Sequence, residues 1–330
     1  MSALPVAAIV LGLAALVWSA DRFVDGAGAA ARLLGVPPLL VGMVVVGFGT
    51  SAPELAVSTF AAVGGNASIA LGNAFGSNTC NIALILGVCA LLRPLPFGRA
   101  AIVREMPLLL VATLLAWFWL RDDALSRSEA LLMLAAFTMM LASSSAAGLR
   151  EHRSGGTAAP DGETAALRPA AAAVRLAAGL AGLVLSSKAL VWGAVGIAHA
   201  LGVSDLLVGL TIVAVGTSLP ELASSVAAAC KGEADIAVGN IIGSNLFNTL
   251  VVVGLAGAIA PIGHVPEAVL ARDVPVAAAF TLTLFLFGAV PLLRRRPASL
   301  RRWQGAVLLL GYLAYTAWLV RGETGGGVGG

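Results

Sequence analysis

Two glutamates occupy positions in the sequence where charged residues are rare. Glu54 and Glu221 each lie in the middle of a segment made mostly of Val, Gly, Ala and Leu. An ionisable side chain at the centre of an apolar membrane segment costs about 3 kcal/mol on insertion scales, so it needs a partner, water or a function. Arg22 and Lys188 are candidate partners, and protonation is another structural explanation. Because both glutamates share one local sequence, we favour a functional role.

Hydroxyl residues precede each glutamate at helical spacing. Thr50 and Ser51 stand four and three residues before Glu54, so the three side chains share one face of a helix. The second copy of this pattern consists of Thr217, Ser218 and Glu221. A proline directly before each glutamate, Pro53 or Pro220, lacks an N–H and clashes with the carbonyl four residues earlier. We therefore expect each helix to bend there and to offer backbone oxygens near the carboxylate.

A second group of polar residues follows each glutamate. Ser77 and Asn81 are four residues apart, as are Ser244 and Asn248. Together these residues offer carboxylate, hydroxyl, amide and carbonyl oxygens, which suit hard cations such as Na⁺ and Ca²⁺ and not the metals that prefer Cys or His. Two carboxylates balance the charge of one Ca²⁺, and they could equally hold several Na⁺. Shared occupancy of one site by two kinds of cation is a physical basis for exchange.

The composition places these residues in a membrane. Hydrophobic residues make up 59% of the 330 and charged residues 11%, which does not describe a soluble surface. The net charge of +3 could indicate nucleic acid, but the basic residues flank apolar segments and lack interleaved aromatic residues for base stacking. The apolar segments contain no Ser/His pair, HExxH motif or paired Asp motif, so we expect neither an enzyme nor a bound cofactor.

Apolar runs separated by charge, Gly or Pro predict an all-α polytopic membrane protein with ten transmembrane helices. The first and sixth are too long to cross about 30 Å of hydrocarbon upright, so they should be tilted. The stretch 151–170, rich in Gly, Ala and charge, is typical of a linker. The predicted helices cover residues 4–33, 37–63, 66–92, 101–120, 128–149, 171–201, 205–230, 234–260, 274–293 and 303–320.

Self-comparison reveals an internal repeat. Displaced by 167 residues, segment 41–87 aligns without a gap with segment 208–254, and 24 of the 47 positions are identical. We therefore divide the chain into a first five-helix repeat at 1–150, the linker at 151–170 and a second five-helix repeat at 171–330. Because five is an odd number, the second repeat should enter the membrane from the opposite side, as in many secondary transporters built from inverted repeats.

The basic residues supply the orientation. With the N-terminus outside, fourteen Arg and Lys residues fall at inward positions and four at outward ones, which is a positive-inside bias. We therefore expect a multi-pass protein of the cell (inner) membrane. Both termini should lie outside, and the central linker should be cytoplasmic.

One acidic pair in the first helix is not repeated. Asp21 and Asp25 lie one turn apart near the end of the first apolar stretch, and their counterparts in the second repeat are Lys188 and Trp192. We expect this pair to lie at the membrane interface and not to form an accessory ion site.

The doubled motifs resemble those of a known family. The segments GFGTSAPELAVS and GNAFGSNTCNIALILG in the first repeat, with AVGTSLPELASS and GNIIGSNLFNTLVVVG in the second, are similar to the two alpha repeats of the cation/Ca²⁺ antiporter superfamily, especially prokaryotic Na⁺/Ca²⁺ exchangers. The resemblance implies a ten-helix antiporter in which the first and sixth helices slide to change access. It also implies Ca²⁺ and Na⁺ as the partners, in a lipid bilayer, with a monomer sufficient for transport.

The resemblance also implies roles for individual residues. Glu54 and Glu221 look like paired Ca²⁺ ligands, and Asn81 and Asn248 look like central polar ligands. The implied Na⁺ ligands are Thr50, Ser51, Thr217, Ser218, Ser77 and Ser244, and backbone carbonyls are expected from Gly47 and Ala214. Some relatives carry an acid at one of the two asparagine positions. An amide at both leaves two central carboxylates here.

Two alternatives remain open from the sequence. The same architecture could couple Ca²⁺ or another cation to H⁺ in place of Na⁺, because a buried glutamate can carry a proton. A cation channel is the second alternative, since kinked helices with exposed carbonyls could line a pore. The inverted repeat supplies a two-state element, and it therefore favours a carrier over a channel.

Overall fold

The computed structural model describes residues 3–65, 67–153, 168–201 and 214–325, and most of them are helical. The helices of the first half are α1 (Ala3–Leu34), α2 (Pro38–Val41), α3 (Phe48–Thr50), α4 (Ala52–Val63), α5 (Ala67–Thr79), α6 (Leu86–Leu92), α7 (Met106–Leu120) and α8 (Arg127–Arg153). Those of the second half are α9 (Pro169–Ala200), α11 (Ala214–Thr217), α12 (Leu219–Lys231), α13 (Ala234–Phe247), α14 (Val253–Ile259), α15 (Val274–Leu293) and α16 (Arg302–Gly325).

Short π-helical segments continue several of these helices, at similar places in the two halves. They are η1 (Gly42–Gly47), η2 (Cys80–Ile85), η3 (Ala101–Glu105), η5 (Asn248–Val252) and η6 (Val269–Asp273). A π-helical turn holds one residue more than an α-helical turn and is frequent at functional sites. Here η2 contains Asn81 and η5 begins at Asn248, so both asparagines of the predicted site lie where the helix is locally widened.

Eight helices in the described part of the chain are long and apolar enough to cross a membrane. The bent pair formed by Pro38–Thr50 and Ala52–Val63 gives a ninth. The predicted seventh helix, 205–230, begins outside the described residues and is seen from Ala214 onward. The count of ten therefore stays a prediction.

Two helices extend into the stretch 151–170 that the sequence predicts to be a linker. Helix α8 continues through Arg153 and α9 already begins at Pro169, whereas the sequence placed both ends in the linker 151–170. Charged residues at 150–153 resemble a loop in sequence, but basic residues such as Arg150 and Arg153 are also favourable in the last turn of a helix. Residues 154–167 of the predicted linker lie outside the described residues.

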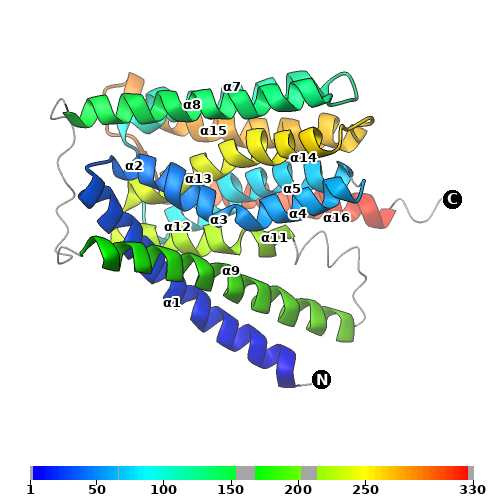
Figure 1. Cartoon of the computed structure of the whole chain (residues 1–330), viewed down its shortest axis with the longest axis horizontal. Helices are drawn as coiled ribbons and strands as arrows, with labels where there is room; N and C mark the ends of the chain where they lie inside the picture. The colour runs from blue at the N-terminus through cyan, green and yellow to red at the C-terminus, as the bar shows by residue number, and fades with distance from the viewer. Residues whose placement is uncertain (1–2, 66, 154–167, 202–213, 326–330) are drawn as a thin grey trace.

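The helices form a buried centre and exposed flanks (Figure 1). The α13–α14 span is almost entirely buried and the α5–α6 span mostly so, whereas α1, α8, α9 and α16 are largely exposed. Helices α1 and α9 pack along each other and form a layer on one side of the molecule. Both contain 32 residues, or about 48 Å at 1.5 Å per residue, so they must tilt to fit a bilayer, as the sequence predicts.

Glycines bring the two halves into backbone contact at the centre. A Cβ on Gly42 would lie 2.6 Å from the carbonyl oxygen of Ile236, and one on Gly239 would lie 2.3 Å from that of Leu39. Small residues at helix interfaces in membranes allow this close approach. Gly42 and Gly239 therefore allow close packing at these positions, where η1 and α2 of the first half lie against α13 of the second.

Short extended segments tie the loops of one half to those of the other. Strand β1 (Leu95–Pro96) pairs antiparallel with β2 (Ser299–Leu300). A single bridge joins Leu125 to Ile262. Ile262 is the repeat counterpart of Leu95 at the 167-residue offset. The corresponding loop of the second half therefore also pairs with a loop of the first half.

We predict that Gly239→Ala destabilises the protein by about 1–3 kcal/mol, because the added methyl group meets backbone that cannot move aside. A matched control is Gly196→Ala on α9, where the new Cβ would make ordinary contacts of 3.5 and 3.7 Å with Pro5. Thermal unfolding in detergent should show a lower Tm for the first variant and an unchanged or higher Tm for the second. Equal melting temperatures would refute the close-packing account.

Candidate functional site

The bends predicted from the two prolines are present as one-residue breaks between helices. Ser51 separates α3 from α4, with φ −80° and ψ 7°, and Ser218 separates α11 from α12, with φ −89° and ψ 8°. The segments Pro38–Thr50 and Ala52–Val63 meet at 46°. Because both serines adopt the same conformation, the repeat in the sequence is also a repeat in local structure.

Each break places a glutamate in the first turn of a new helix. Glu54 lies in the first turn of α4 and Glu221 in that of α12. The N–H groups of a first turn lack helical acceptors and favour negative charge. Pro53 and Pro220 occupy the start of these helices, where a missing N–H costs little. Both glutamates are 0% exposed, so their carboxyl groups are removed from solvent.

Serines hold the glutamates across the boundary between the halves. Ser51 of the first half donates to Glu221 Oε1 of the second at 3.0 Å. Ser218 of the second half donates to Glu54 Oε1 of the first at 3.2 Å. Ser218 Oγ also lies 3.4 Å from Ser77 Oγ, so α5 reaches the same cluster. The two carboxylates are therefore joined to one polar centre built by both repeats.

The other oxygen of each carboxylate has no hydrogen-bond partner in the described part of the chain. This holds for Glu54 Oε2 and Glu221 Oε2, and also for the side-chain oxygens of Asn81 and Asn248. All four residues are 0% exposed. Buried polar atoms are nearly always satisfied, because an unpaired one costs about 1–3 kcal/mol. These four unpaired oxygens belong to predicted ligands, and a bound cation would supply the partner that they lack.

The first-half residues Thr50 and Gly47 contact the second half. Thr50 Oγ1 lies 3.0 Å from the carbonyl oxygen of Val46 and 3.2 Å from Asn240 Oδ1. Ser244 donates to the carbonyl oxygen of Gly47 at 3.2 Å. The structure thus brings Thr50, Gly47 and Ser244 together.

Two second-half residues of the predicted set are less completely described. Ala214 is the first described residue of α11, and Thr217 ends that helix and has a polar partner. The preceding segment 202–213 lies outside the described residues. The expected carbonyl ligand at Ala214 stays a prediction.

Sequence reasoning missed a pair of asparagines that fix the backbone of the glutamates. Asn73 donates to the carbonyl oxygen of Glu54 at 3.1 Å and to Ser58 Oγ at 3.0 Å. The counterpart Asn240 lies 3.4 Å from the carbonyl oxygen of Glu221 and donates to Ser225 Oγ at 2.8 Å. The available signal was the identity of these Asn and Ser residues in the two repeats.

A second missed group orients Asn81. Asn81 donates to Asn245 Oδ1 at 2.9 Å, which leaves its own oxygen free. Asn245 donates in turn to the carbonyl oxygen of Asn78 at 3.2 Å, and Asn78 donates to Thr249 Oγ1 at 2.7 Å. The amide of Asn81 is thereby fixed with its oxygen unpaired, as a cation ligand requires.

The donor atoms of the site are oxygens, which are the ligands that hard cations prefer. Among the described residues, no group of three or more His, Cys, Asp or Glu side chains is arranged to hold a metal, so the charge comes from two carboxylates and the other donors are neutral oxygens. Within the same residues, no ion pair joins Glu54 or Glu221 to a basic side chain. Arg22, one of the suggested partners, lies over the ring of Trp18.

One protein family and two individual relatives are similar to this chain over most of its length. The sequence pattern of the family described as sodium/calcium exchanger protein matches residues 4–145 and 171–321. The chain is 45% identical over 317 residues to a protein of Alkalimonas amylolytica provisionally named antiporter CaxA, covering 93% of this chain and 96% of that protein. It is 38% identical over 323 residues to the inner membrane protein YrbG of Escherichia coli (strain K12), covering 96% and 97%.

A solved structure is also similar over nearly the whole chain. The sodium-calcium exchanger NCX_Mj, soaked with 10 mM Na⁺ and 10 mM Sr²⁺, superposes with a TM-score of 0.80 at 30% identity. The superposition covers 96% of this chain and 99% of that one. The similarity therefore extends to the helices that frame the two glutamates.

We predict that Asn240→Ala lowers the free energy of unfolding by about 1–3 kcal/mol and weakens Ca²⁺ binding about tenfold, because it releases the backbone that carries Glu221. The matched control is Gln304→Ala, which also removes a buried amide, but one on α16 that accepts the N–H of Arg301 just before that helix. Calorimetric titration should show weaker binding only for Asn240→Ala. Equal Ca²⁺ affinities in the two variants would contradict the role of Asn240.

Proposed function

The chain belongs to the family of sodium/calcium exchanger proteins, and from this premise we propose that it is a secondary active antiporter that exchanges Ca²⁺ for Na⁺ by alternating access. The family expected from the doubled motifs is thereby confirmed. The observation that carries the proposal is the pair of buried carboxylates, each held by a serine of the other half and each with one unpaired oxygen.

Glu54 and Glu221 are the proposed central Ca²⁺ ligands. A Ca²⁺ ion accepts six to eight oxygen ligands, including carboxylates, amides, carbonyls and water. The unpaired oxygens of both glutamates, Asn81 and Asn248 supply part of such a shell. Two carboxylates neutralise one Ca²⁺, so the loaded centre carries no net charge.

Na⁺ competes for the same centre in this proposal. The hydroxyl groups and backbone carbonyls around the glutamates complete the coordination shell of Na⁺, which carries one charge. The proposed Na⁺ ligands are Thr50, Ser51, Ser77, Thr217, Ser218, Ser244, Gly47 and Ala214. Two uncompensated carboxylates in a buried centre are costly because both are removed from water. The centre therefore changes access when it is loaded with one kind of cation or the other, which couples the two fluxes.

The proposed architecture is two inverted repeats, 1–150 and 171–330, in an inner membrane. Helix α1 begins and α16 ends on the same side of the molecule, whereas α8 ends and α9 begins on the other (Figure 1). This arrangement is what an odd number of spans per repeat produces. Combined with the bias of basic residues, it supports outside termini and a cytoplasmic linker.

H⁺ is the alternative coupling ion. A proton neutralises a buried carboxylate as a Na⁺ does, and the unpaired oxygens of Glu54 and Glu221 are available to either. Uptake of ⁴⁵Ca²⁺ into proteoliposomes under an outward Na⁺ gradient at equal pH, and under a pH gradient without Na⁺, separates the two. We expect uptake in the first condition only, and uptake in the second alone would assign the coupling to H⁺.

We predict that Glu54→Gln or Glu221→Gln lowers Na⁺-driven ⁴⁵Ca²⁺ uptake at least about a hundredfold. Each substitution removes one of the two buried negative charges that balance the charge of Ca²⁺. The matched control is Glu267→Gln, which changes an exposed glutamate between α14 and α15. Membrane insertion should be unchanged in all three variants. Uptake by Glu54→Gln at the level of Glu267→Gln would remove the basis for the assignment.

A further inference from the structure

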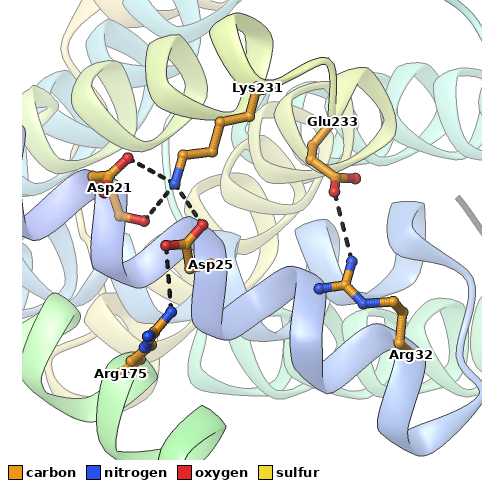
Figure 2. A network of polar contacts seen from close by, with 6 residues as sticks. All are labelled: Asp21, Asp25, Arg32, Arg175, Lys231 and Glu233. Atoms are coloured by element: carbon orange, nitrogen blue, oxygen red, sulfur yellow. Dashed lines mark hydrogen bonds and ion pairs between the residues drawn. The ribbon is translucent and has the colours of Figure 1, made fainter. Parts of the chain in front are cut away.

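An ion-pair cluster joins α1 to the end of α12. Lys231 Nζ lies 2.7 Å from Asp21 Oδ1 and 2.6 Å from Asp25 Oδ1, and it also donates to the backbone oxygen of Asp21 at 2.9 Å (Figure 2). The Lys231 side chain is 27% exposed and that of Asp25 22%. We name Asp21, Asp25 and Lys231 the inner latch.

Neighbouring ion pairs divide into two kinds (Figure 2). Arg175 on α9 lies 3.5 Å from Asp25 on α1, so that contact is internal to the α1–α9 layer. Arg32 at the end of α1 lies 3.8 Å from Glu233, which follows α12. The inner latch and the Arg32–Glu233 pair therefore connect the layer to the rest of the molecule, whereas Arg175 does not.

The α1–α9 layer is built to move as one body. A Cβ on Gly179 would lie 2.7 Å from the backbone of Phe23, and one on Gly26 would lie 2.7 Å from the backbone nitrogen of Leu176. A Cβ on Gly193 would likewise lie 2.7 Å from the carbonyl oxygen of Pro5. Backbones in such close contact resist sliding past each other, so displacement of the layer concentrates at its contacts with other helices, of which α12 makes the most with α1.

Helix α12 links the inner latch to the cation centre. Glu221 lies in its first turn and Lys231 in its last, about 15 Å apart along one helix. The end of the helix is fixed by Gly232 at φ +82° and by Arg93, which donates to the carbonyl oxygen of Cys230 at 3.1 Å. Holding α1 at Lys231 therefore holds it against the helix that carries a central carboxylate.

The inner latch has no repeat-related counterpart between α9 and the end of α4. At the 167-residue offset, Lys231 corresponds to Gly64, Asp21 to Lys188 and Asp25 to Trp192. In a protein of two inverted repeats, the outward-open and inward-open states are related by exchanging the conformations of the halves. A contact between the halves that lacks its repeat-related counterpart lowers the energy of one of these states and not of the other.

We propose that Lys231 is a positioning residue of the exchange cycle: through the inner latch it holds the cytoplasmic side of the pathway closed and so sets the balance between the two access states. This inference rests on the proposed exchange function. It assigns a role to the unrepeated Asp21 and Asp25 that differs from ion binding. Opening toward the cytoplasm requires α1 to leave α12 at this point, whereas opening to the outside does not.

Loss of the inner latch should change the apparent Ca²⁺ dissociation constants at the two membrane faces in opposite directions. The apparent dissociation constant at each membrane face equals the intrinsic constant divided by the fraction of protein open to that face. Loss of the inner latch raises the inward-open fraction and lowers the outward-open one. For partly exposed ion pairs the ratio of the two apparent constants should change about two- to fivefold.

The test measures Ca²⁺ half-saturation at both faces, in inside-out and right-side-out membrane vesicles driven by a Na⁺ gradient. Lys231→Met should lower the constant at the cytoplasmic face and raise it at the outer face, while Lys231→Arg should keep both values of the unmodified protein. Arg175→Gln is the matched control, because it removes a partner of Asp25 that lies within the layer. It should leave the ratio unchanged.

Equal shifts at both faces, or no shift, in Lys231→Met would overturn the inference, since a structural defect has no side preference. If that variant fails to insert, Asp25→Asn decides in the same assay by the same criterion. Absence of Na⁺-driven Ca²⁺ flux in the unmodified protein would overturn the proposed function and the inference with it. That result is distinct, because it appears before any substitution is made.

Discussion

The structure depends on one electrostatic constraint: two carboxylates lie in the interior of a membrane protein and neither is paired with a basic side chain in the described part of the chain. Two buried charges of the same sign are unfavourable unless a cation balances them. Serine hydroxyls and first-turn N–H groups reduce this cost but do not cancel the charge. In the proposed function a bound cation balances these charges, and this requirement links ion binding to the motion of the helices.

The surrounding elements bring the two carboxylates to one polar centre. A one-residue break at Ser51 and Ser218 turns each glutamate inward at a helix start. Because Ser51 holds Glu221 and Ser218 holds Glu54, neither half builds a complete centre alone. Backbone contact through Gly42 and Gly239 lets the halves approach near this point. The proposed duplication of a five-helix unit would provide two equivalent carboxylates facing one centre.

The sequence predicted the local features well and the contacts between the halves poorly. Proline before a buried glutamate predicted the bends, whereas helical spacing grouped Ser51 with Glu54, and Ser51 instead donates to Glu221. Helical spacing did not show that the carboxylate is that of the other half, because spacing within one repeat is silent on how two repeats dock. The clamp by Asn73 and Asn240 was visible only as identity between repeats. The ion pairs of Lys231 were missed since their partners are 206 and 210 residues away.

The most direct measurement is a crystal structure of the protein soaked with Ca²⁺, with the ion located by its anomalous scattering. We predict one Ca²⁺ peak at about 2.3–2.6 Å from a carboxylate oxygen of Glu54 and from one of Glu221 together. A Ca²⁺ peak bound to only one of these glutamates, or located away from both, would contradict the account.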